Sequence, residues 1–150
     1  MLALILAATA ALMLASPAAA DDSPYVGASE CKNCHEATYV AWAKSKHATA
    51  IMRLSPAEKS GGACIRCHVT GSPEQIAAEK DMPSHPGVQC ESCHGGGRAH
   101  VEAAKAGDAA KVHLVKAPDE KSCATCHNDT GPHFKGFFYK AMAPMVHRTK

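Results

Sequence analysis

The pentapeptide Cys31-Lys32-Asn33-Cys34-His35 has the pattern Cys-x-x-Cys-His, which returns at Cys64–His68, Cys90–His94 and Cys123–His127. In a c-type haem site of this pattern, two thiols bond to the porphyrin edge and the adjacent His binds the iron. The four motifs contain every cysteine of the chain. We therefore predict four covalently attached haems c, held by Cys31, Cys34, Cys64, Cys67, Cys90, Cys93, Cys123 and Cys126 and ligated by His35, His68, His94 and His127.

Cysteine pairs of this spacing also occur in zinc sites and in disulfide frameworks. Zinc would pair the first motif with the second, and the third with the fourth, as two four-thiolate sites. An exported chain can also hold four disulfides. Neither alternative explains the His that follows every pair, and only 10 of the 150 residues are His. The motifs therefore favour haem.

The first 20 residues have the pattern of a secretory signal. Leu2 to Leu14 is apolar, and Ala18-Ala19-Ala20 offers small residues for cleavage. We expect a signal peptide at 1–20 and one domain at 21–150. An uncleaved anchor is the alternative, but the apolar stretch is shorter than the roughly 20 residues of a membrane span, and no later segment qualifies. Export to the periplasm is the simplest location; an extracellular or outer-surface location stays open.

Large apolar residues are scarce after residue 20, with two Leu, three Ile, eight Val and three Phe. Such a chain buries too little surface to offset the entropy of ordering it. Haem groups are flat and apolar, so we expect them to form most of the core and the haem-free chain to be unfolded.

The polypeptide has a formal net charge of +2, to which haem propionates would add negative charge. It has no basic run or aromatic ladder, so nucleic acid is not an expected partner.

The predicted fold class is mainly α and loop-rich, with little or no β. Helices are expected at 34–54, 73–80, 98–106 and 137–146, the last interrupted at Pro144, whereas 109–115 is ambiguous.

Each iron needs a second axial ligand, and His on both faces gives a lower potential than Met does. Outside the motifs the mature chain has six His and four Met: His47, His85, His100, His113, His133, His147, Met52, Met82, Met142 and Met145. The number of His favours bis-His ligation. If His47 shares a helix with His35, it lies about 18 Å along the axis and must reach a different haem.

The chain resembles the cytochrome c-554 family of multihaem cytochromes in several stretches. They include Ser45-Lys46-His47-Ala48, the run from Gly87 to Gly95 with His100 after it, and the fourth motif with the terminal His147. The resemblance implies a compact helical domain, haems in close stacked and angled pairs, and electron transfer. It also implies that His100 serves the first haem, His147 the third and His47 the fourth.

The second haem has no distal protein ligand in the type member of that family. Here His85 stands just before the Gly87 run, so we predict His85 as its ligand. His113 and His133 are left without a role.

An electron carrier with donor and acceptor proteins as its partners is the leading functional prediction, and an enzyme is less favoured. One alternative is a small redox enzyme that acts on nitric oxide, nitrite or hydroxylamine at an open second haem. Another is a homo-oligomer or haem-lined filament, in which His133 or His147 ligates a haem of the next protomer.

Overall fold

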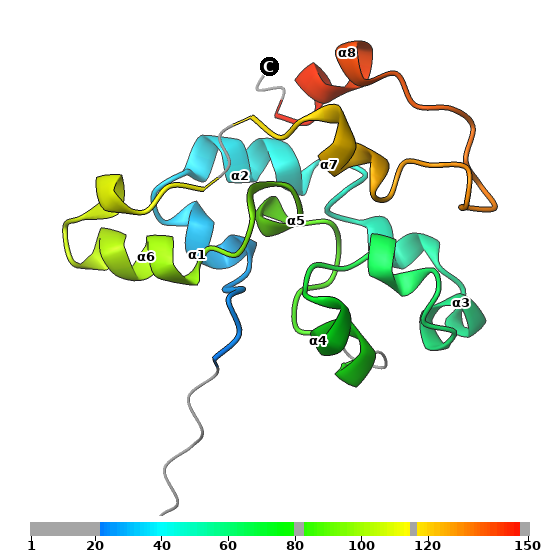
Figure 1. Ribbon diagram of the computed structural model, residues 1–150, viewed down its shortest axis with the longest axis horizontal. Coiled ribbons are helices and arrows are strands. Elements are labelled where there is room, and N and C mark those ends of the chain that lie inside the picture. The colour runs from blue at the N-terminus through cyan, green and yellow to red at the C-terminus, as the bar shows by residue number, and fades with distance from the viewer. Residues whose placement is uncertain (1–21, 80–82, 115–116, 148–150) are drawn as a thin grey trace, which may run out of the picture.

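The computed structural model describes residues 22–79, 83–114 and 117–147. The expected signal peptide and Met82 lie outside these ranges. The described chain forms short helices joined by loops (Figure 1). In order they are α1 (Ala28–Lys32), α2 (Glu36–Ala43), η1 (Ala50–Arg53), α3 (Pro56–Ser60), η2 (Ile65–Cys67), α4 (Pro73–Ala78), α5 (Cys90–His94), α6 (Arg98–Lys105), η3 (Ala109–Lys111), α7 (Glu120–Ala124), α8 (Tyr139–Met142) and η4 (Ala143–Met145).

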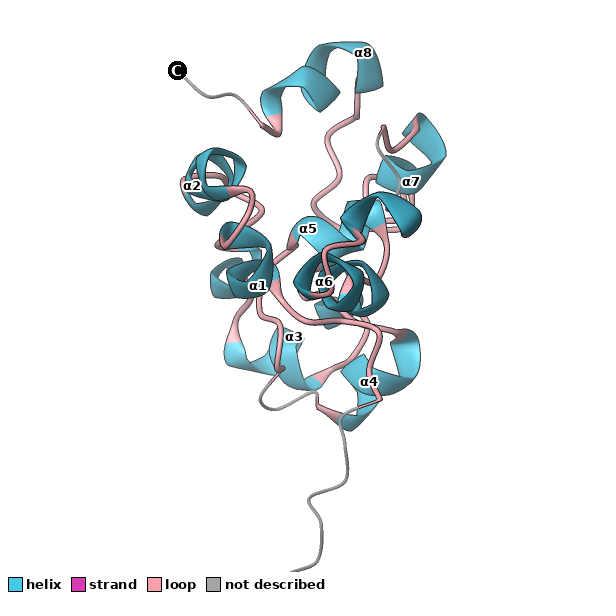
Figure 2. Ribbon diagram, turned by 90° about the vertical axis from the view of Figure 1, so that its left-hand side faces the viewer, coloured by secondary structure: helices cyan, strands magenta, loops and turns pink. Residues whose placement is uncertain are grey.

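The helices surround α5, which lies at the centre of both views (Figures 1 and 2). α8 lies on one side of α5 and α3 and α4 lie on the other. No strand occurs among the described residues, and the only β pairing there is one antiparallel bridge between Val69 and Pro86. The predicted helical, loop-rich class is therefore confirmed.

Local side-chain caps explain where several of these helices begin. Ser72 accepts from the Gln75 N–H at the start of α4, and Asp119 accepts from the Ser122 N–H at the start of α7. Ser55 and Glu58 form a reciprocal capping box at α3. A cap supplies an acceptor for an N–H that has no partner within the helix. These short helices thus begin where the sequence offers Ser or Asp.

The expected helix at 34–54 is wrong, because α2 ends at Ala43 and a turn at 44–49 precedes η1. Polar residues follow Ala43, and the Ser45 hydroxyl accepts from the Ala48 N–H. Short polar side chains that bond to the backbone compete with helix continuation. The turn also directs the His47 carbonyl to the Val88 N–H at 2.9 Å, a contact between segments far apart in the chain.

The other expected helices are present with shifted ends. The segments at 73–80 and 98–106 contain α4 and α6, and the ambiguous 109–115 contains η3. The C-terminal segment is α8 followed by η4, so the helix tightens at Ala143, one residue before Pro144. Proline removes a backbone donor, which is compatible with this change of helix type.

Buried polar contacts connect α5 to the N-terminal segment. The Glu91 carboxylate, 2% exposed, accepts from the backbone N–H groups of Val26, Gly27 and Gly97 at 2.7–3.2 Å. Gln89 accepts from the Ala28 N–H at 2.6 Å. The buried hydrophobic residues of the described chain are few: Ala28, Ala50, Leu54, Ile65 and Val69.

Candidate haem-binding site

All four Cys-x-x-Cys-His motifs lie on or beside short helices. The first runs from the end of α1 into a turn, the second contains η2, the third is α5, and the fourth spans the end of α7. None of the eight cysteines is in a disulfide. A single helical turn brings both cysteines and the His of a motif close together, so that all three can reach one haem.

Thiols of different motifs lie next to each other. The Cys31 thiol hydrogen-bonds to that of Cys90, which raises the pKa of Cys31 and lowers the pKa of Cys90 to about 7. Burial and the neighbouring Cys126 raise the pKa of Cys67 to about 11. The first motif therefore lies beside the third, and the second beside the fourth.

Two motif histidines face a second His from elsewhere in the chain. The ring centres of His94 and His147 are 5.8 Å apart, and those of His47 and His127 are 6.0 Å apart. Two metal–nitrogen bonds of about 2 Å, with about 1 Å from each nitrogen to its ring centre, require about 6 Å. Both pairs therefore have the spacing that fits one iron between two imidazoles.

Three of these four rings line a common cavity of about 350 Å³. His47 enters it from the turn after α2, His94 from α5 and His147 from the turn after η4. Trp42 and the thiols of Cys90, Cys93 and Cys123 also line it. Burial lowers the pKa of both His47 and His147, so the neutral form that binds metal is favoured. The donor set thus suits haem.

Backbone carbonyls orient two further histidines. His68 Nδ1 donates to the Ala50 carbonyl at 2.7 Å, and His100 Nδ1 donates to the Val112 carbonyl at 2.8 Å. A carbonyl partner holds the proton on Nδ1 and leaves the lone pair on Nε2. His68 and His100 are therefore in the form in which a ligating His is usually held.

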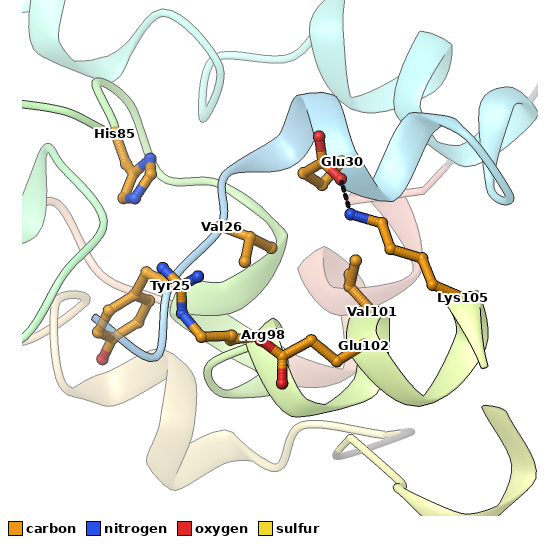
Figure 3. A pocket seen from close by; sticks show the side chains of 8 residues that line it. All are labelled: Tyr25, Val26, Glu30, His85, Arg98, Val101, Glu102 and Lys105. Carbon is orange, nitrogen blue, oxygen red and sulfur yellow. Dashed lines mark hydrogen bonds and ion pairs between the residues drawn. The ribbon is translucent and has the colours of Figure 1, made fainter. Parts of the chain in front are cut away.

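The His85 side chain lines a pocket of its own, separate from the cavity of the facing histidines. Figure 3 shows its ring in a pocket of about 260 Å³ with Tyr25 and Arg98, on the side of α6 that faces α1. No motif cysteine or motif His lines this pocket. The ring packs against the N-terminal segment so closely that a Cβ on Gly27 would lie 3.0 Å from His85 Nδ1. Its predicted ligation stays a prediction.

The two histidines left without a role are both exposed. His133 lies 3.7 Å from the Glu58 carboxylate on the surface of α3, and its side chain is 84% exposed. His113 lies in the loop after η3. His35, the motif His of the first site, is also exposed.

Residues that support the ligands were not found from the sequence. Trp42 donates from Nε1 to the Val88 carbonyl at 2.7 Å, and Ala50 orients His68 through its backbone. Trp42 is the only Trp in the sequence, and this could have marked it as a candidate supporting residue. Ala50 acts through its backbone carbonyl, which every residue has, so the sequence does not indicate this contact.

Within the described residues, no group of three or more His, Cys, Asp or Glu is arranged to hold a metal ion. None of the helices in the described ranges has the length and apolar character needed to cross a bilayer.

Comparison with known proteins finds a matching family. Residues 30–95 match the family described as "Cytochrome c554 and c-prime". Cytochrome c-554 of Nitrosomonas europaea is 31% identical over an alignment that covers 78% of this chain and 63% of that protein. C-type polyheme cytochrome OmcB of Geobacter sulfurreducens is 35% identical over 75 residues, 45% of this chain and 9% of that one.

A solved structure, the reduced state of cytochrome c554 from Nitrosomonas europaea, matches with a TM-score of 0.49 and 24% identity over 85% of this chain and 80% of that chain. In the sequence comparison, the chain spans 63% of the length of the cytochrome c-554 of Nitrosomonas europaea. The motifs, the helical architecture and the family match agree: residues 30–95 match the cytochrome c-554 family of c-type cytochromes, and the chain resembles its members.

Proposed function

We propose that this protein is an exported electron carrier with four covalent haems c in one domain at 21–150, after a signal peptide at 1–20. The observation that carries the proposal is the presence of two pairs of facing imidazoles. The ring centres of His94 and His147 are 5.8 Å apart, and those of His47 and His127 are 6.0 Å apart. Haem iron supplies one-electron redox chemistry when bound. The two imidazoles of each pair would hold a haem iron between them, and such an iron can exchange electrons without opening a coordination site.

The neighbouring thiols support close haem pairs. Porphyrins attached at Cys31 and Cys90 share one region of the molecule, and those attached at Cys67 and Cys126 share another. We propose that electrons pass along these pairs and leave to redox partner proteins in the periplasm. His100, whose Nδ1 is held by the Val112 carbonyl, is the proposed distal ligand of the first haem.

Mass spectrometry of the exported protein tests the cofactor count. The expected result is cleavage after residue 20 and four haem adducts, with a matching haem content from the pyridine haemochrome assay. Fewer than four adducts, or an exported protein that holds zinc, would contradict the proposal. Anaerobic redox titration then tests electron transfer, since a carrier should take up four electrons reversibly without substrate.

The place of His85 favours one second candidate, a small-molecule redox enzyme with an open second haem. Its ring lines the same pocket as Tyr25 and Arg98, and no motif cysteine or motif His lines that pocket. Its backbone, however, is beside the second motif, because the Thr70 N–H donates to the His85 carbonyl at 3.0 Å. His85→Ala separates the two functions by the spin states of the irons.

If His85 ligates the second haem, the unmodified ferric protein is fully low-spin and His85→Ala makes one haem high-spin. If the second haem is open, the unmodified protein already has one high-spin haem that responds to nitric oxide, and His85→Ala leaves that number unchanged. Gel filtration at several protein concentrations tests the filament alternative, in which the apparent size would rise with concentration.

A further inference from the structure

The segment at 47–50 joins the turn after α2 to the first residue of η1 and contacts residues in or beside three different motifs. It is called the 47–50 turn below. The His47 ring is 6.0 Å from that of His127 in the fourth motif. The Ala50 carbonyl accepts from His68 Nδ1 in the second motif at 2.7 Å. The His47 carbonyl accepts from the N–H of Val88, which lies two residues before the third motif, at 2.9 Å. One turn thus places a distal ligand and orients a motif His.

Both backbone polar groups of Val88 have a hydrogen-bond partner. Its N–H donates to the His47 carbonyl, and its carbonyl accepts from Trp42 Nε1 at 2.7 Å. Trp42 is near the end of α2, where its ring packs against that of Tyr39 with centres 5.5 Å apart. Val88 therefore connects the end of α2 to the turn that carries His47, and the position of His47 follows from both bonds.

Gly87 permits this approach. Its φ is +86°, which disfavours other residues, and an added Cβ would lie 2.5 Å from the Ala48 carbonyl oxygen and 3.1 Å from that of His47. Both neighbours are backbone atoms of the turn, so neither can rotate away. A side chain at 87 would have to push the 47–50 turn away from Val88.

We propose that Trp42 and Gly87 are positioning residues that set the place of His47 against the fourth haem. This inference rests on the proposed ligation of that haem by His47. Gly87 allows the turn to approach Val88, and Trp42 holds Val88 from the other side. Because Ala50 belongs to the same turn, a displaced turn also weakens the bond to His68. The reduction potential of the second haem should then shift, since a hydrogen-bonded imidazole is the more basic ligand.

The test uses the exported protein with its haems, and Gly87→Ala is the central variant. Its matched control is Gly107→Ala, because Gly107 also has a positive φ of +81° but an added Cβ there meets nothing within 4 Å. His47→Ala is the reference for a lost ligand. Low-temperature electron paramagnetic resonance and the visible spectrum of the ferric protein report the spin state of each haem.

We expect one additional high-spin haem per molecule in Gly87→Ala and in His47→Ala, and none in Gly107→Ala. Free imidazole should return that haem to the low-spin state in both variants, because it replaces an absent or displaced ligand. A merely structural effect of Gly87→Ala would lower stability without this spin change and rescue.

Two results would overturn the inference, and they are distinguishable. If His47→Ala makes one haem high-spin but Gly87→Ala matches Gly107→Ala, the positioning role is wrong and the proposed ligand stands. If His47→Ala leaves the spin states unchanged, the ligand assignment itself fails. Should Gly87→Ala not be exported, Trp42→Phe removes only the indole donor and Tyr39→Phe is its control. A Trp42→Phe spectrum identical to that of Tyr39→Phe would then overturn the inference.

Discussion

At the scale of single residues, His147 and His133 offer a contrast within the C-terminal region. His147 faces His94 at 5.8 Å, whereas His133 is 84% exposed beside Glu58. We expect His147→Ala to open one haem, so that the reduced protein binds one more molecule of carbon monoxide than the unmodified protein. His133→Ala should bind no more than the unmodified protein does. An equal gain in both variants would contradict the assignment of His147.

The residue types alone separate motif histidines from the others, because a motif His follows its cysteines at a fixed spacing. They do not rank the six remaining His, since the distance between His47 and His127 depends on how the 79 intervening residues fold. The prediction that His47 reaches a different motif agrees with its position, although the continuous helix behind that argument is absent. For His85 the sequence predicts ligation of the second haem. The structure places its backbone beside the second motif and its ring against Gly27.

At the scale of elements, Glu91 is the strongest link between α5 and the N-terminal segment. Its buried carboxylate accepts from three backbone N–H groups, and hydrogen bonds to a charged group contribute about 1.5–3 kcal/mol each, although not additively. Glu91→Ala leaves these donors without an acceptor, so we expect the free energy of unfolding to fall by about 3 kcal/mol or more.

Guanidinium denaturation of the haem-containing variants measures this loss. Glu102→Ala is the control, because Glu102 is exposed on α6. Equal denaturation midpoints for Glu91→Ala and the unmodified protein would show that the carboxylate contributes nothing to stability.

Helix positions were predictable where local caps determine them, as at Ser72 before α4. The end of α2 was not, because the apolar pattern continues to Leu54 and the break depends on distant partners. Those partners are the Val88 bonds to His47 and Trp42, which join segments about 40 residues apart. Hydrophobic periodicity reports only local preference, so a turn stabilised by tertiary contacts does not appear in it.

At the scale of the whole molecule, the hydrophobic core of the polypeptide is too small to stabilise the fold without haem. Buried hydrophobic residues in the described ranges number five, whereas large apolar side chains such as Phe138 and Met145 are 70% and 55% exposed. Burial of apolar surface contributes about 25 cal/mol per Å², and ordering the chain costs about 1–2 kcal/mol per residue. We therefore expect the haem-free chain to lack a cooperative thermal transition. Calorimetry of the full chain produced without haem attachment checks this, and a sharp melting peak would contradict it.

Acid should detach the distal histidines that the fold holds neutral. Burial, with a smaller effect of the neighbouring imidazole, lowers the pKa of His47 and His147 below the ordinary value of about 6.5. As the pH falls through 6.5, the unfolded chain binds protons before the folded protein does, so the free energy of unfolding decreases. The stabilisation is thus fully present above this pH and is lost as the pH falls through the lowered values.

Iron competes with the proton for the same nitrogen, which moves the loss further toward acid. We expect two haems to become high-spin on acidification below about pH 6.5, in steps that reverse when the pH is raised. A spectrophotometric titration at constant ionic strength measures them. His47→Ala should remove one step and leave the other, and His133→Ala should keep both. A spectrum that changes only as the pH rises would contradict the sign of the effect, because deprotonation favours these ligands.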